Sequence, residues 1–406
     1  MTEEQLIYDW NRQSGGGELT HSPEVLDVTL LEAPHSPAAR QPALSERLRL
    51  LHQLDELGLD LACLGDAGEG WAETLPLVSE VVESRLKVRP AVVCQSHASE
   101  LERVAEACEQ LGHAIHVLLQ CGYSPLQDWK GEAWTAARAE RMQESIMFAV
   151  GLGLNVTLLC PDAPRAHPAW LVDTLGRALD SGAQRLALVD TTGCATPEGV
   201  ARLMAFVAEL CRRKAAPQRI DWFGFNDRGL ALANALTALE SGASRVHASV
   251  LGLAERSGCV PLDLLLINLR LLGALDRPME ALASVCQRVA ETYQVEVLSN
   301  YPVLGKDAFR TGTGVHAAAI IKAERKGFSW LADLIYSGVP AALFGFEQLI
   351  EVGPMAGESN VLHWLGRNGL EATPERVQAL LAAAKSADHV LSDEEIRVAL
   401  GETASV

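Results

Sequence analysis

Short apolar runs alternate with longer amphipathic segments over the first two thirds of the chain. Nearly every position in a run is apolar, whereas the longer segments repeat their apolar residues at helical spacing. A strand that is apolar on both faces is typical of a parallel sheet covered by helices. The runs therefore predict eight buried parallel strands, at 25–30, 59–65, 89–94, 114–120, 154–160, 185–191, 219–225 and 245–252.

The segments between these runs carry the end signals of helices. Residues 45–58 and 99–112 both end at a glycine, and Pro197 stands at the start of another such segment; these are usual stop and start signals. Eight strand–helix units in about 250 residues predict an α/β fold of the (β/α)8 TIM barrel type. A doubly wound open sheet is the main alternative, but no GxGxxG motif follows the first run.

The predicted barrel occupies residues 23–290 and follows an N-terminal extension at 1–22. The barrel spacing is lost in residues 291–406, where glycine-containing segments precede two short amphipathic helices near the end. We expect this part to form smaller, mainly helical subdomains that cover the mouth of the barrel.

Composition and charge narrow the class of protein. The 406 residues are 48% hydrophobic and 21% charged, as in folded proteins, and the net charge of -18 argues against binding to nucleic acid or to an anionic membrane. The first residues are acidic and lack the apolar core of a signal peptide, and no apolar stretch is long enough to span a membrane. We therefore expect a cytoplasmic protein whose nine cysteines are reduced thiols, since none has CxxC spacing.

The chemistry of a TIM barrel lies at the carboxyl ends of its strands. Asp190, at the end of the sixth run, is expected to hold a loop through backbone hydrogen bonds. Cysteines near several strand ends fit small core residues, a thiol site for a soft metal, or a thiolate nucleophile. Phe223 and Phe225 occupy alternate strand positions and should project to one side. They predict either core packing at the rim or one wall of a pocket.

Five segments together resemble the isopropylmalate synthase and homocitrate synthase family, a group of HMG-CoA lyase-like, metal-dependent barrels (DRE-TIM metallolyases). They are VLDVTLLEA (25–33), DTTGCATPEG (190–199), the run from GFNDRG to ERSGC (224–259), DAFRTGTGVHAAAIIKA (307–323) and VGPMAGESNV (352–361). The resemblance covers nearly the whole predicted barrel and the subdomains after it. It includes no counterpart of the leucine-sensing domain of many isopropylmalate synthases, so no leucine-regulatory domain is expected.

The resemblance implies an acyltransferase that condenses an acyl-CoA with a 2-oxo acid. In the family a divalent metal polarises the oxo group and a base removes a proton from the acyl group. The resemblance also implies small-molecule substrates and a homodimer, with no partner of another kind.

The family's metal ligands are missing at the matching positions. These positions are held by Glu32, Phe223, Phe225 and Cys259, and the family's catalytic arginine is replaced by Leu31. Phenyl rings donate no lone pair, and one carboxylate with one thiol is a poor ligand set for Mg²⁺ or Mn²⁺. We therefore expect no cofactor and no divalent metal, with acyl-CoA entering as substrate.

Other family positions keep residues that could bind substrate or take part in catalysis. Thr191 matches the threonine that holds the oxo-acid carboxylate, and His316 and Tyr336 match the residues that reach over the active site. The candidate catalytic residues are Glu32, Asp162, His316 and Tyr336. The candidate substrate-binding residues are His116, Thr191, Phe223, Phe225, Asn226 and Cys259.

Three functions remain open on the sequence alone. The first is a divergent carbon–carbon bond enzyme that works without the usual metal, with Glu32 as a base or, alternatively, only an ion-paired carboxylate. The second is a catalytically inactive relative that binds a ligand or an active paralogue. The third is an ordinary 2-isopropylmalate synthase-type enzyme that uses unexpected metal ligands.

Overall fold

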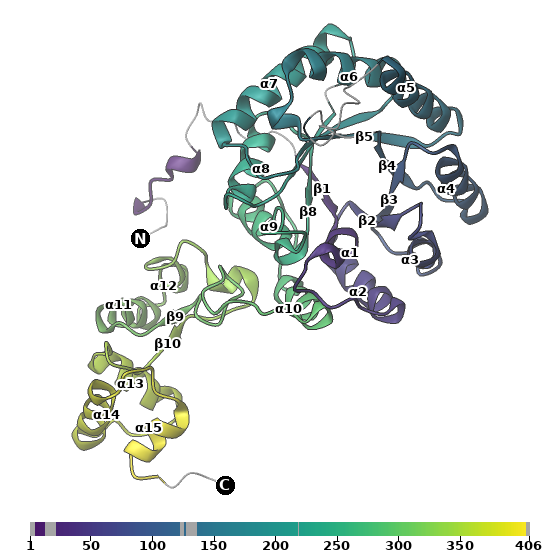
Figure 1. The fold of residues 1–406 in the computed structure, drawn as a ribbon. Helices are drawn as coiled ribbons and strands as arrows, with labels where there is room; N and C mark the ends of the chain where they lie inside the picture. Colours follow the sequence, from purple (N-terminus) through teal and green to yellow (C-terminus); the bar gives the residue numbers. More distant parts are fainter. Residues whose placement is uncertain (1–4, 13–21, 122–125, 127–135, 218, 403–406) are drawn as a thin grey trace. The chain divides into compact units, whose positions relative to one another are not determined.

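The computed structural model describes residues 5–12, 22–121, 126, 136–217 and 219–402, which form two compact units (Figure 1). One unit is Asn11–Val295; the other comprises Glu296–Val406 with the N-terminal segment Met1–Trp10. No helix in the described part of the chain has both the length and the apolar character needed to cross a bilayer.

The first unit is a closed barrel of eight parallel strands, each paired with the next and the last paired with the first. Figure 1 shows the strands at the centre with the helices outside them. The strands are β1 (Glu24–Asp27), β2 (Leu61–Asp66), β3 (Arg89–Gln95), β4 (His116–Gln120), β5 (Asn155–Pro161), β6 (Arg185–Asp190), β7 (Ile220–Gly224) and β8 (Arg245–Ala248). The TIM barrel predicted from the apolar runs is confirmed.

Amphipathic helices cover the outside of the barrel. The α-helices are α1 (Thr29–Glu32), α2 (Leu44–Glu56), α3 (Trp71–Glu83), α4 (Ala98–Leu111), α5 (Ala136–Gly151), α6 (Pro168–Asp180), α7 (Pro197–Arg213), α8 (Ala231–Glu240), α9 (Leu262–Leu271) and α10 (Ala281–Tyr293). Short 3-10 turns lie at η2 (Trp10–Arg12), η3 (Ala33–His35), η4 (Ala163–Arg165) and η5 (Val250–Gly252). The end signals act as expected: Gly112 ends α4 in the left-handed conformation, and the Thr196 hydroxyl accepts a hydrogen bond from the backbone N–H of Gly199 at the start of α7.

The first and last strands are shorter than their apolar runs. The chain leaves β1 after Asp27, because that carboxylate accepts hydrogen bonds from the backbone N–H and the hydroxyl of Thr29 and turns the backbone into α1. The eighth run likewise leaves its strand after Ala248 and continues into η5. Both runs are buried throughout most of their length, and burial alone does not distinguish a strand from the helical turn that follows it.

Two layers fill the barrel interior. Alternate residues of a strand face inward, so β7 contributes both Asp221 and Phe223, and β8 both Arg245 and His247. The layer toward the amino ends of the strands is charged. The layer toward the carboxyl ends is an apolar cluster of Leu26, Val28, Leu61, Cys63, Ala91, Leu118, Val189, Phe223, Phe225, Ala254 and Cys259.

The second unit is mainly helical. Its elements are β9 (Arg310–Thr311), α11 (Gly314–Arg325), α12 (Ser329–Leu334), η6 (Ala341–Phe344), β10 (Leu349–Ile350), α13 (Glu358–Arg367), α14 (Pro374–Ser386) and α15 (Asp393–Ala399). β9 and β10 form a small parallel pair, and α14 and α15 are the two short helices expected near the end. One apolar cluster lies around α11 and α12, and another joins α13, α14 and α15.

Candidate functional site at the carboxyl ends of the barrel strands

A cavity of about 410 Å³ opens at the carboxyl ends of the barrel strands. We call it the mouth pocket. Its apolar lining residues are Val28, Leu31, Val93, Leu118, Leu159, Pro161, Val189 and Phe223. Its polar lining residues are Glu32, His35, Asp66, Gln95, Gln120, Thr191 and His247. The lining thus combines a large apolar surface with two carboxylates, and none of the described residues that form it is a lysine or arginine. The apolar surface suits a ligand with a substantial apolar part.

Glu32 and His35 form an acid–imidazole pair at the rim of the mouth pocket. Nδ1 of His35 lies 3.5 Å from Oε2 of Glu32, and the Glu32 side chain is only 12% exposed. The hydrogen bond that the His35 ring donates to Glu32 raises the pKa of His35, against the opposing effect of partial burial. The pair therefore favours a protonated His35 beside Glu32, whose carboxylate oxygens lie at the pocket rim where a bound molecule could transfer a proton to them.

Asp27 supports the helical turn that carries Glu32. Its carboxylate is completely buried and bonds to the backbone N–H of Thr29 at 2.8 Å, while the Thr29 hydroxyl accepts a hydrogen bond from the backbone N–H of Val250. The other carboxylate oxygen has no hydrogen-bond partner among the described residues. Burial raises the pKa of Asp27 to about 6, despite the opposing hydrogen bonds from Thr29.

Asp27→Asn is expected to raise the free energy of unfolding at pH 8 by about 2–3 kcal/mol and to have little effect at pH 4. The folded pKa of about 6 lies above the ordinary value of 3.8, so the folded state holds more protons than the unfolded state between those pH values. Wild-type stability from this group is therefore greatest below pH 4 and is lost as pH rises through about 6. Urea unfolding measured from pH 4 to pH 8 tests this prediction. Asp276→Asn is the control, because the Asp276 side chain is 97% exposed. The prediction would be contradicted if the free energies of unfolding of Asp27→Asn and wild type changed with pH in parallel.

Phe223 and Phe225 belong to both the core and the site. Their ring centroids are 5.3 Å apart, and each residue is 8% exposed within the apolar cluster of the barrel. Phe223 lines the mouth pocket, whereas the guanidinium of Arg256 lies 4.8 Å from the centroid of Phe225. Arg256 in turn pairs with Asp227 at 2.8 Å. The two rings therefore form an apolar wall on the β7 side, and the Arg256 guanidinium packs on the Phe225 ring as a cation–π contact.

A divalent metal of the family type does not fit these side chains. Three of the four family ligand positions hold Phe223, Phe225 and Cys259, and burial raises the pKa of the Cys259 thiol well above its ordinary value. A neutral thiol and two phenyl rings leave Glu32 as the one anionic donor of the set. Within the described ranges, no group of three or more His, Cys, Asp or Glu side chains is placed to hold a metal ion.

Thr191 lies in the mouth pocket, and Asp162 lies behind it. The backbone N–H of Asp162 donates to the Thr191 hydroxyl oxygen at 2.9 Å, which leaves the hydroxyl proton to point elsewhere. The carboxylate of Asp162 is buried and bound by both arms of Arg165, at 2.6 and 2.9 Å. Asp162 is therefore placed to position Thr191 and the loop; it does not line the pocket.

Three other predicted residues lie outside the mouth pocket. Asn226 accepts a hydrogen bond from the backbone N–H of Ala231 at 3.2 Å and so fixes the start of α8. Cys259 is 1% exposed in the apolar cluster. His116 is the first residue of β4 and lies at the opposite end of the barrel. Its expected position near the mouth is corrected: Gln120, at the other end of the same strand, lines the pocket instead.

Asp190 holds the loop after β6, as expected. One of its carboxylate oxygens accepts from the N–H of Cys194 and the other from the N–H of Ala195, each at 3.0 Å. Gly193 in this loop has a positive φ of 57°, and a Cβ there would lie 2.6 Å from the carbonyl oxygen of Phe225. The loop therefore packs directly against the end of β7.

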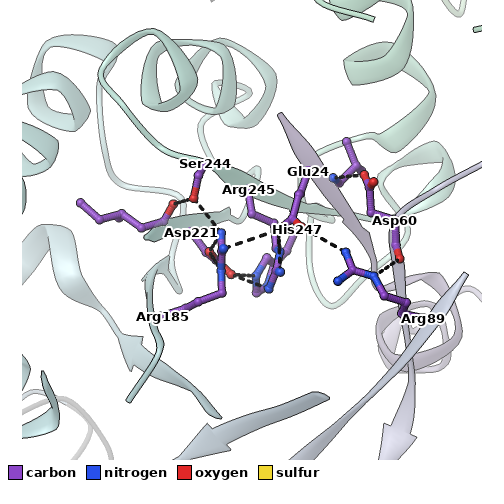
Figure 2. Close-up of polar contacts among 10 residues, drawn as sticks. Glu24, Asp60, Arg89, Arg185, Asp221, Ser244, Arg245 and His247 are labelled. Carbon is purple, nitrogen blue, oxygen red and sulfur yellow. Dashed lines mark hydrogen bonds and ion pairs between the residues drawn. The ribbon is translucent and has the colours of Figure 1, made fainter. Parts of the chain in front are cut away.

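His247 lies between the mouth pocket and the charged layer of the barrel. Its ring packs on Phe223 with centroids 5.6 Å apart, and its Nε2 lies 3.0 Å from Oδ2 of Asp221. Burial lowers the pKa of His247, and this outweighs the opposing effect of Asp221, so a neutral ring donates from Nε2. Figure 2 shows His247 joined through Asp221 to Arg185 and Arg245.

His316 and Tyr336 lie in the second unit and are brought together there. Their rings stack with centroids 3.9 Å apart and an interplanar angle of 26°. His316 belongs to α11, and Tyr336 follows α12 closely. Their catalytic role stays a prediction.

Sequence reasoning did not single out several residues of the mouth pocket. These are His35, Asp66, Gln95, Gln120 and His247. The sequence could have pointed to three of them by their positions. His35 stands three residues after Glu32, and Gln95 and Gln120 are the last residues of their strands. His247 gave no such signal, since it lies inside an apolar run.

The fold and the mouth pocket define this chain as a (β/α)8-barrel protein with its candidate site at the carboxyl ends of the strands. The HMGL-like family profile matches residues 22–292. The chain therefore belongs to the HMGL-like family.

Relatives of known name span most of the chain. It is 28% identical over 378 residues to the homocitrate synthase of Pyrococcus horikoshii, which covers 89% of this chain and 94% of that protein. It is 27% identical over 314 residues to the 2-isopropylmalate synthase of Solidesulfovibrio magneticus, covering 74% of this chain and 59% of that protein. The HMG-CoA lyase structure from Brucella melitensis superposes with a TM-score of 0.56 at 18% identity, over 68% of this chain and all of that one, which supports the barrel fold.

Proposed function

We propose that this chain is an acyltransferase of carbon–carbon bond chemistry that acts on an acyl thioester and a 2-oxo acid without a divalent metal. The mouth pocket carries the proposal, because Glu32 and Thr191 line it, and Phe223 and Phe225 stand at its β7 side in place of the imidazoles that would bind the metal. The names of the relatives, homocitrate synthase and 2-isopropylmalate synthase, support the class of reaction.

Glu32 is the proposed base. It takes a proton from the carbon next to the thioester carbonyl, and the electron pair left on that carbon attacks the oxo carbon of the second substrate. The oxo oxygen gains the electron pair of its double bond and receives the proton back from Glu32, so that it becomes a hydroxyl. Water then attacks the thioester carbonyl and the carbon–sulfur bond breaks, which yields a carboxylate, a free thiol that keeps one proton of the water, and a second proton that is released to solvent.

The charge that develops on the oxo oxygen needs partners other than a metal. Thr191 offers its hydroxyl proton, and the side-chain amides of Gln95 and Gln120 line the same pocket. Preorganised donors in a pocket with apolar walls stabilise a developing oxyanion more strongly than the same groups do in water.

A non-catalytic binding protein is the second candidate. The observation that favours it is the joint replacement of the metal ligands and of the catalytic arginine, here by Leu31. Such a protein would hold an acyl thioester in the mouth pocket without turning it over. An ordinary metal-dependent synthase is disfavoured by the chemistry of the available donors.

The proposed function is tested by measuring free thiol released from a panel of acyl-CoAs, each mixed with a panel of 2-oxo acids. The protein is first treated with a chelator and dialysed. We expect at least one pair to give thiol release that depends on both substrates and is unchanged by the chelator or by added Mg²⁺ or Mn²⁺. Turnover that returns only with a metal would contradict the metal-free reaction. Binding seen as a rise in Tm, with no turnover for any pair, would establish the non-catalytic alternative.

A further inference from the structure

A second cavity lies at the other end of the barrel, around the amino ends of the strands. Its volume is about 400 Å³, and we call it the basal cavity. Its lining residues include Glu24, Arg89, His116, Arg185, Arg219 and Arg245. The active sites of TIM-barrel enzymes lie at the carboxyl ends of the strands. The basal cavity shares no described lining residue with the mouth pocket, so the proposed reaction does not use it.

The basal cavity concentrates positive charge in an acidic protein. The chain carries 34 lysines and arginines against 52 acidic residues, yet four arginines gather here. Figure 2 shows how three of them are held by two carboxylates. The Glu24 carboxylate contacts Arg245 at 2.6 Å, Arg89 at 3.0 Å and Arg185 at 3.5 Å. The Asp221 carboxylate contacts Arg185 at 2.6 Å and Arg245 at 3.3 Å. Three guanidinium groups therefore share two carboxylates, and the fourth arginine of the lining pairs with neither of them.

Arg219 is the fourth arginine, and it is exposed at the edge of the cavity. No ion pair joins it to a carboxylate within the described part of the chain, whereas Arg89 is paired but still 43% exposed on its side chain. Burial lowers the pKa of His116 to about 4, and the charges of Arg245 and Arg89 add to the effect. His116 is therefore a neutral ring in a positive field, and its ring nitrogens remain able to hydrogen-bond.

We propose that the basal cavity binds a small multivalent oxyanion, either a di- or tricarboxylate or a phosphate, between the guanidinium groups of Arg219 and Arg89. Planar guanidinium groups match both kinds of anion through paired N–H donors. The volume is at the small end of the range for ligand pockets, which suits a compact anion. The proposal stands independently of the reaction at the mouth pocket.

The cavity is joined to the mouth pocket by a continuous set of contacts. Arg245 bonds to Asp221, Asp221 to His247, and His247 lines the mouth pocket beside Phe223. The basal cavity is therefore connected to the wall of the mouth pocket through Arg245, Asp221 and His247.

The test measures binding of sodium phosphate, sodium succinate and sodium citrate to the full chain by titration calorimetry and by the rise in Tm, with sodium chloride at equal ionic strength as reference. We expect saturable binding of at least one of these probes, and about tenfold weaker binding to Arg219→Gln, since one charge-assisted contact is lost. Binding of phosphate but not of the two carboxylates, or the reverse, would show which kind of anion the cavity prefers. Arg202→Gln is the matched control, because Arg202 is an exposed arginine on α7 that pairs with Glu198.

Three results would overturn the proposal. One is that none of the three anions binds saturably beyond the chloride reference. Another is that Arg219→Gln binds as tightly as wild type, which would place the anion elsewhere. The last is an equal loss of anion affinity in Arg219→Gln and Arg202→Gln, which would show that the affinity depends only on the net charge of the protein. Arg219 is exposed and forms no ion pair with any described residue, so its replacement should not disturb folding.

Discussion

Asp221→Asn is expected to lower the free energy of unfolding by about 3–5 kcal/mol at pH 7, which is a large part of the stability of a typical domain. The substitution keeps the shape of the side chain and removes its charge. It leaves Arg245, which is 2% exposed, and Arg185 without one of their two carboxylates in the interior of the barrel. It also exchanges a charged acceptor of the His247 ring for a neutral one.

The size of this effect follows from the difference between forming a buried ion pair and removing one of its partners. A buried pair contributes little relative to apolar residues, but the removal of one partner leaves the other charge buried without compensation. Burial by itself raises the pKa of Asp221; the hydrogen bond from His247 and the charges of Arg185 and Arg245 outweigh it and hold the pKa below its ordinary value. A lowered folded pKa contributes stability that is present above the unfolded pKa of about 4 and is lost as pH falls through the folded value.

Urea unfolding monitored by circular dichroism measures the loss. Asp180→Asn is the control, because Asp180 pairs with Lys214 at 2.6 Å but its side chain is 55% exposed; we expect a change within about 1 kcal/mol. The gap between wild type and Asp221→Asn should begin to narrow as pH falls below about 4, where the unfolded chain takes up the proton, and should close as pH passes the lowered pKa of folded Asp221. A loss at pH 7 no larger than that of Asp180→Asn would show that the charged layer does not stabilise the barrel.

The barrel itself was predictable because its strands are apolar on both faces. The charged layer at its base was not. Asp221, Arg245 and His247 stand inside apolar runs, and a sequence shows only that alternate residues share a face. Which inward-facing residues meet depends on the register of neighbouring strands, such as the pairing of Glu24 with Arg245 across β1 and β8. That register is set by the closed barrel as a whole.

The mouth pocket was partly predictable for the same reason. Glu32 and Thr191 stand just after strands, and this position places them at the carboxyl ends without further information. His116 was misplaced because its run shows no boundary, and the strand begins at His116 itself. Gln95 and Gln120 were missed because an amide carries no distinctive chemistry. The function of Asp162 as a partner of Arg165 depends on a turn with a positive φ of 59°, which the sequence does not signal.

Glu32→Gln is expected to reduce thiol release by about 10²–10⁴-fold while leaving substrate binding within a few-fold of wild type. Glutamine has the size and shape of glutamate but cannot accept the α-proton. A base that takes and returns the proton acts in the step itself, so the loss should appear in kcat more than in KM. Glu255→Gln is the matched control, because Glu255 is a nearby acid with 60% side-chain exposure that pairs with Arg256 and does not line the pocket.

A second measurement separates this role from simple loss of structure. The hydrogen bond that the His35 ring donates to Glu32 raises the pKa of His35, so the His35 ring should titrate at a lower pH in Glu32→Gln, as seen by NMR, while Glu255→Gln should shift it much less. Both readouts are needed. A lower His35 pKa with unchanged turnover would make Glu32 a positioning residue for His35 and would move the search for the base to Asp66, the other carboxylate of the pocket. Loss of turnover with loss of ligand-induced stabilisation would instead mean that Glu32 acts in binding, because a base that works only in the chemical step leaves the bound complex intact.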